Sequence, residues 1–79
     1  MTHETRLQNI QRTISAVLGI EENLITEDSS ADNLPGWDSV NHLNIIMALE
    51  EVCGTSFSPD DMMEMTSVSS ILEKLAGNT

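Results

Sequence analysis

The sequence has one cysteine, one tryptophan, one phenylalanine and no tyrosine among its 79 residues. A single cysteine cannot close a disulfide bridge within the chain, which excludes a disulfide-stapled secreted scaffold. No apolar run approaches the roughly 20 residues that span a bilayer, and the first residues, MTHETRLQNIQRT, lack the apolar core of a secretion signal. We therefore expect a protein that inserts into no membrane and works in the reducing cytoplasm.

Basic residues are almost as scarce. Arg6, Arg12 and Lys74 stand against thirteen acids, and residues 13–73 hold every one of those acids except Glu4, with no Lys or Arg. Nucleic acids and anionic membranes are bound through Lys and Arg, so neither is an expected partner. The formal net charge of −10 either keeps a small protein in solution or attracts basic protein partners and speeds their encounter.

What the sequence does have is helical periodicity. Apolar residues recur at intervals of three and four, and no stretch alternates with a period of two for long enough to form a strand. The predicted class is all-α, with three longer helices and a short third one in a single domain, residues 1–79. The helices are expected within residues 4–20, 39–52, 58–65 and 66–77.

Start and stop residues frame these four helices. The first helix is expected to end at Gly19, and the second to begin at Asp38 or Ser39 and end at Gly54. The third is expected to begin at Ser58 and Pro59, with Asp61 completing a capping box. The fourth is expected to begin at Thr66 or Ser67 and end at Gly77.

The connection between the first two helices, residues 20–38, is long for a compact domain. Four apolar side chains are expected to pack it onto the core: Leu24, Ile25, Leu34 and Trp37. Its end, LPGW, predicts a tight turn, because Pro35 suits the second position and Gly36 accepts the positive φ of the third. Such a turn delivers Asp38 and Ser39 to an exposed helix start.

The second helix has two faces when its residues are placed at about 100° intervals. The predicted core stripe is Ile45, Ile46, Leu49, Val52 and Cys53. The opposite face carries Val40, Asn44, Met47 and Glu51. Val40 and Met47, one heptad apart, either form a docking patch for a partner or are isolated exposed residues, which are common. Cys53 is expected to be a buried structural thiol rather than a reactive one.

No catalytic or metal constellation emerges. His42 follows Ser39 by three residues, but no acid is placed to orient it, and GWDSV lacks the second glycine of a nucleophile elbow. DSSADNLPGWDS has Asn33 in place of the glycine of a calcium loop and Ser39 in place of its bidentate glutamate. Two histidines and one cysteine do not make a zinc site. The chain is not expected to be an enzyme.

These segments together resemble the acyl carrier proteins and related peptidyl carriers. The resemblance covers nearly the whole chain: the first helix, the long acidic loop, LPGWDSV in place of the family's Asp-Ser-Leu signature, IIMALEEV, the short helix at SPDDMMEM and the last helix at TSVSSILEKL. The pair Asp-Ser alone is a weak motif. At a helix start, after an acidic loop and before ALEE, it is far more specific.

The resemblance implies that a separate phosphopantetheinyl transferase esterifies Ser39 with the 4'-phosphopantetheine of coenzyme A. The arm's terminal thiol would carry acyl or aminoacyl groups as thioesters between a loading enzyme and downstream synthases or transferases. Asp38 would help to hold the metal used in the transfer, and no resident metal is implied. Val40, Asn44, Met47 and Glu51 would face the partners of a monomeric carrier.

The chain departs from the family pattern close to Ser39. Val40 replaces the usual leucine, and Asn41 and Asn44 stand where many fatty-acid carriers have acids. These departures favour a specialised pathway, such as polyketide, nonribosomal-peptide or surface-polymer assembly, over primary fatty-acid synthesis. The alternative hypothesis is an unmodified acidic helical protein that binds a basic partner, with Ser39 acting only as a helix cap.

Overall fold

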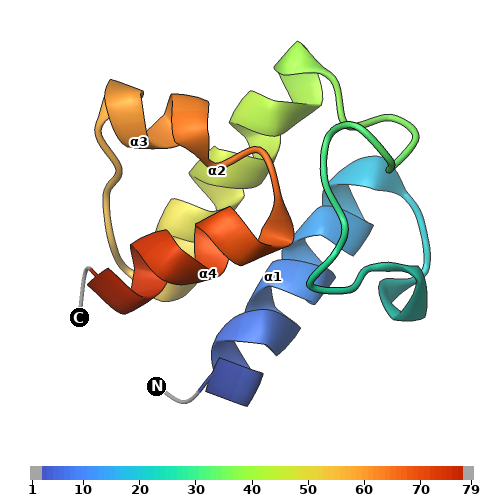
Figure 1. Ribbon diagram of the computed structural model, residues 1–79, viewed down its shortest axis with the longest axis horizontal. Helices are drawn as coiled ribbons and strands as arrows, with labels where there is room; N and C mark the ends of the chain where they lie inside the picture. Colours follow the sequence, from blue (N-terminus) through green and yellow to red (C-terminus); the bar gives the residue numbers. More distant parts are fainter. Residues whose placement is uncertain (1–2, 78–79) are drawn as a thin grey trace.

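The computed structural model describes residues 3–77, and these fold as helices joined by loops (Figure 1). The elements are α1 (His3–Leu18), a short 3-10 helix η1 (Glu22–Leu24), α2 (Ser39–Cys53), α3 (Pro59–Glu64) and α4 (Val68–Gly77). Within this part of the chain the only β-type pairing is an isolated bridge between Ser30 and Ser67. The predicted all-α class, with a short third helix and a long first loop, is confirmed.

One apolar core joins α1, α2 and α4 with the long loop. Its fully enclosed side chains include Ile10 and Ile14 of α1, Ile45, Ile46 and Leu49 of α2, and Val68 and Ile71 of α4. Within each set the residues are three or four positions apart or, for Ile45 and Ile46, adjacent, so each helix turns one apolar stripe inward. Burying such stripes is the main favourable contribution to folding in a domain of this size.

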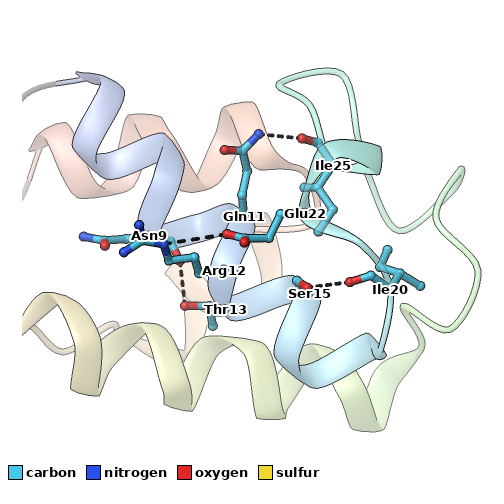
Figure 2. A network of polar contacts seen from close by, with 8 residues as sticks. All are labelled: Asn9, Gln11, Arg12, Thr13, Ser15, Ile20, Glu22 and Ile25. Atoms are coloured by element: carbon cyan, nitrogen blue, oxygen red, sulfur yellow. Dashed lines mark hydrogen bonds and ion pairs between the residues drawn. The ribbon is translucent and has the colours of Figure 1, made fainter.

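The long loop is fastened to α1 by polar contacts (Figure 2). Gln11 donates from Nε2 to the carbonyl oxygen of Ile25 at 2.7 Å, and the Ser15 hydroxyl donates to the carbonyl of Ile20. The side chains of Arg12 and Glu22 approach to 3.7 Å, both largely exposed. Ile25 and Trp37 are buried and Leu34 packs against the core, so three of the four predicted anchors are confirmed.

A second attachment joins the loop to the segment between α3 and α4. The backbone N–H of Ala31 donates to the Thr66 carbonyl at 2.9 Å, and that of Val68 donates to the Ser29 carbonyl at 2.9 Å. Ser67 caps α4, because its hydroxyl accepts from the Ser70 N–H at 3.2 Å while the Ser70 hydroxyl accepts from the Ser67 N–H at 3.1 Å. Of the two predicted caps, Thr66 and Ser67, the structure selects the second.

The prediction that Leu24 and Val52 belong to the core is wrong. Leu24 is 60% exposed, because it ends the 3-10 turn and the chain sends Ile25 inward instead. Val52 is 54% exposed. It stands at the edge of the apolar stripe, near the end of α2, and borders a shallow hollow whose other wall includes the polar Asn9 and Arg12 of α1. Within residues 3–77, no helix combines the length and apolar character that crossing a membrane would require.

Candidate attachment site at the start of α2

The turn before α2 has the geometry that its sequence predicts. Gly36 adopts a φ of 90°, and the Trp37 N–H donates to the Leu34 carbonyl at 3.3 Å. Pro35 and Gly36 therefore occupy the second and third positions of a turn that requires a positive φ at its third. The Trp37 side chain is 4% exposed and fixes the turn to the core.

Asp38, and not Ser39, is the N-cap of α2. Its backbone is extended, and its Oδ1 accepts from the Asn41 N–H at 2.9 Å. The Asn41 side chain reaches back and donates from Nδ2 to the Gly36 carbonyl at 2.8 Å. A carboxylate at position 41 has no proton to donate in that bond, so Asn41 locks the turn to the first turn of the helix in a way that an acid would not.

Ser39 consequently does not cap the helix. It is exposed, it is the first residue of α2, and its hydroxyl has no hydrogen-bond partner within residues 3–77. It borders an open hollow of about 250 Å³ whose other lining residues are Ala31, Trp37, Asp38, His42 and Thr66. The backbone N–H groups of a helix start favour negative charge there, which suits a phosphate ester on this hydroxyl.

His42 cannot act as a base for Ser39, because both of its ring nitrogens are occupied. Trp37 donates from Nε1 to Nδ1 at 3.0 Å, and Nε2 lies 2.7 Å from the Met62 carbonyl oxygen. The two rings are stacked, with centroids 6.2 Å apart. Both nitrogens of His42 thus bond to groups other than the Ser39 hydroxyl. Within residues 3–77, no group of three His, Cys, Asp or Glu side chains is arranged to hold a metal.

The outer face of α2 is exposed as predicted. Val40 is 70% and Met47 63% exposed, and Asn44 and Glu51 are exposed with them. Sequence reasoning missed two more apolar residues next to this face: Leu43, 54% exposed on α2, and Met63, 77% exposed on α3. Leu43 could have been found, because at 100° per residue it falls beside Met47. Met63 could not, because nothing in the sequence sets how α3 is turned against α2.

Cys53, predicted to be a buried structural thiol, is only half-buried, although it packs against the core. Its burial raises the pKa of the thiol, which lowers the fraction present as the reactive thiolate. A nucleophilic role for this cysteine is therefore disfavoured.

The comparison with known families decides the identity of the fold. The protein-family model described as the phosphopantetheine attachment site matches residues 8–75 of this chain. The acyl carrier protein of Guillardia theta is 31% identical over 67 residues, covering 85% of this chain and 82% of its own length. The acyl carrier protein of Cyanidium caldarium is 30% identical over 73 residues, covering 92% and 85%. The chain belongs to the acyl carrier protein family.

Members of this family are carriers and not enzymes, and their cofactor is a covalently attached 4'-phosphopantetheine. The residues at the start of α2 fit that group. A free, exposed serine hydroxyl stands at a helix start that favours a phosphate, and the neighbouring hollow leaves room for substituents on it. A carrier of this kind meets a phosphopantetheinyl transferase and acyl-handling enzymes.

Proposed function

We propose that this carrier protein takes 4'-phosphopantetheine on the hydroxyl of Ser39 and presents the attached acyl or aminoacyl groups to the enzymes of a biosynthetic pathway. The observation that carries the proposal is that Asp38, and not Ser39, caps the helix. Asp38 caps α2, so Ser39 is left exposed with an unused hydroxyl at the helix start. The cofactor supplies a terminal thiol that holds the acyl group as a thioester.

The residues around Ser39 prepare it for an external enzyme. The base that removes the hydroxyl proton comes from the transferase, because His42 is engaged on both nitrogens. The N-terminus of α2 stabilises the negative charge of the phosphodiester that forms. Asp38, exposed beside Ser39, retains an oxygen beyond the one that caps the helix and offers it to the metal that the transferase uses.

Partner enzymes are proposed to dock on the outer face of α2. Val40 and Met47 provide exposed apolar area, Asn44 provides a polar contact between them, and Glu51 provides one a turn beyond Met47. Methionine adapts its shape to several partners, which suits a carrier that visits a loading enzyme and then downstream synthases or transferases. The charge of −10 steers partners with basic docking sites.

We infer a specialised pathway, such as polyketide, nonribosomal-peptide or surface-polymer assembly. The support is the local chemistry near Ser39: Asn41 is committed to the carbonyl of Gly36, and Asn44 is a neutral residue on the partner face, so this end of α2 shows partners less negative charge than acids would. We further propose that residues 1–79 act as one monomeric carrier domain. A reducing compartment such as the cytoplasm would keep the arm's thiol and Cys53 reduced.

The direct test is intact-mass spectrometry after incubation with coenzyme A, Mg²⁺ and a broad-specificity phosphopantetheinyl transferase. We expect one phosphopantetheinyl group on the wild type and on Ser56→Ala, a matched control at an exposed serine, and none on Ser39→Ala. Ser39→Ala should stay folded, because the capping oxygen belongs to Asp38. The modified chain should accept an acyl group that hydroxylamine removes, and Cys53→Ser should leave this loading unchanged.

Modification that persists in Ser39→Ala, or an acyl load that depends on Cys53, contradicts the proposal. A wild-type chain that keeps its unmodified mass beside an active transferase would favour the alternative, an acidic interaction protein.

A further inference from the structure

The short helix α3 lies close to the start of α2, because His42 of α2 contacts the Met62 carbonyl of α3. This helix has only six residues, Pro59–Glu64, and none of its side chains is fully buried. Met62 packs against the core, and the flanking Phe57 and Met65 are buried, so polar contacts add to these apolar anchors in holding α3 in place. Lys74 of α4 contacts Asp61 and Glu64 on one side, and the ring of His42 reaches the Met62 carbonyl on the other.

The two hydrogen bonds of His42 select one tautomer of its ring. The indole N–H of Trp37 can only donate, so the Nδ1 that faces it accepts and carries no proton. The Met62 carbonyl can only accept, so the Nε2 that faces it carries the proton. These two partners match the Nε2–H tautomer of His42, and the ring links three segments: the turn at residues 34–38, the first turns of α2, and α3.

The ring stands next to the surface that a partner would meet. His42 lines the hollow beside Ser39 and also a second, almost wholly apolar hollow of about 260 Å³ between α2 and α3, which it shares with Leu43, Pro59, Met62 and Met63. Leu43 and Met63, both exposed, belong to the two facing helices. The distance between these helices sets whether the two side chains and Ser39 present one surface.

We propose that His42 is a positioning residue that fixes α3 against the start of α2 and so sets the surface that the phosphopantetheinyl transferase recognises around Ser39. It never contacts the reacting hydroxyl as a base. It acts through Trp37, which holds the turn, and through the Met62 carbonyl, which holds α3. The inference rests on the proposed function for its enzymatic consequence, while its structural content belongs to the unmodified chain.

Three variants separate this role from simple packing. His42→Gln keeps one acceptor and one donor on a single planar group, whereas His42→Leu keeps bulk and loses both. Trp37→Phe keeps an aromatic ring in the core and removes only the N–H. A net hydrogen bond corresponds to roughly a two- to twelvefold change in an equilibrium. Circular dichroism establishes that each variant is helical before it is compared.

The first measurement uses the unmodified wild type and variants. Nitrogen-15 NMR of the His42 ring should show the Nε2–H tautomer, and Trp37→Phe should alter its Nδ1 signal. Amide hydrogen exchange of α3 and of Trp37 should quicken roughly five- to tenfold in His42→Leu and return close to wild type in His42→Gln. A ring protonated on Nδ1, or α3 exchange that His42→Leu leaves unchanged, overturns the inference whether or not Ser39 is modified.

The second measurement is the rate of Ser39 modification at varied carrier concentration. For His42→Leu we expect KM to rise roughly five- to tenfold with kcat within about twofold, and for His42→Gln a KM near that of wild type, since the loss is in the docking surface and not in the chemistry. An unchanged KM in His42→Leu, or a loss confined to kcat, contradicts the inference. Absence of modification in the wild type refutes the proposed function instead, and the exchange data then decide the role of His42.

Discussion

The ammonium group of Lys74 on α4 lies 3.0 Å from the Asp61 carboxylate and 2.6 Å from that of Glu64, both on α3. Lys74 is the only Lys or Arg after Arg12 in the sequence. This one basic side chain therefore joins the short helix α3 to α4. Contact with the two acids raises the pKa of Lys74 to about 12, and Lys74 lowers the pKa of Asp61.

The first prediction is a pH dependence of this contact. The folded pKa of Asp61 is depressed below its ordinary 3.8, so its contribution is present above that pH and is lost as the pH falls through the folded value. The folded pKa of Lys74 is raised from 10.5, so its contribution is present below that pH and is lost as the pH rises toward 12. Stability from the pair is therefore fully present near neutral pH.

Thermal unfolding of Lys74→Met and Asp61→Asn measures this. Both should melt slightly below wild type at neutral pH, a small effect because the pair is partly solvated. The deficit of Asp61→Asn should shrink as the pH is lowered below about 4. A deficit that grows in acid would show that Asp61 acts through some other contact.

The second prediction concerns the whole charge distribution. Between Arg12 and Lys74 the chain carries twelve acids and no base, so like charges repel throughout the folded state. Moderate salt or millimolar Mg²⁺ should screen this repulsion and raise the melting temperature. Scanning calorimetry in the two conditions tests the point, and a melting temperature that neither addition raises would count against a dominant role for repulsion.

The third prediction tests the partner face. Val40 and Met47 are mostly exposed, so changing either to Asp should leave helicity and melting nearly intact while transfer to or from partner enzymes is impaired. Glu51→Lys on the same face should slow association, with a defect that diminishes as salt rises. Stopped-flow binding gives the association rates.

The control for that series is Glu73→Lys, an identical charge change at an exposed position of α4. It should slow association much less than Glu51→Lys does. Equal defects would mean that partners respond to net charge alone, and a large loss of stability in the Val40 or Met47 variant would assign that side chain to the core.

The fourth prediction concerns the turn before Ser39. Gly36 has a φ of 90°, and an added Cβ would lie 3.7 Å from Leu18, an ordinary contact. Gly36→Ala therefore costs backbone strain rather than a clash, about 1–2 kcal/mol by chemical denaturation. Gly54→Ala, at a φ of 64° with open space around it, should cost a similar amount. Only Gly36→Ala should shift the Trp37 indole resonance and slow modification of Ser39. Equal effects of both variants on that rate would trace it to lost stability.

Much of the fold follows from the sequence, because periodicity and capping residues act locally. The four helices and the LPGW turn are of this kind. The sequence does not decide between Asp38 and Ser39 as the cap of α2, because both residue types cap well and the two differ by one position. The structure decides it by placing the Asp38 carboxylate on the Asn41 N–H.

What the sequence could not supply depends on contacts between distant segments. Val52 lies on the predicted stripe, yet its exposure depends on which α1 side chains stand opposite. The sequence does not reveal the hydrogen bonds of His42, because its partners are an indole five residues before it and a carbonyl twenty residues after it. No spacing of residues in the sequence predicts that His42 would join Trp37 to the Met62 carbonyl.

The bridge between Ser30 and Ser67 has a consequence for the order of events during synthesis. Besides its contacts with α1, the loop that leads to Ser39 is held by Thr66 and Val68, which the ribosome adds after α2 and α3 are complete. A nascent chain that ends before residue 66 lacks the carbonyl and N–H groups that receive this loop. We expect the serine to reach its settled position only once α4 has emerged, so that the proposed attachment of the arm would follow translation of the last helix and would not accompany growth of the chain.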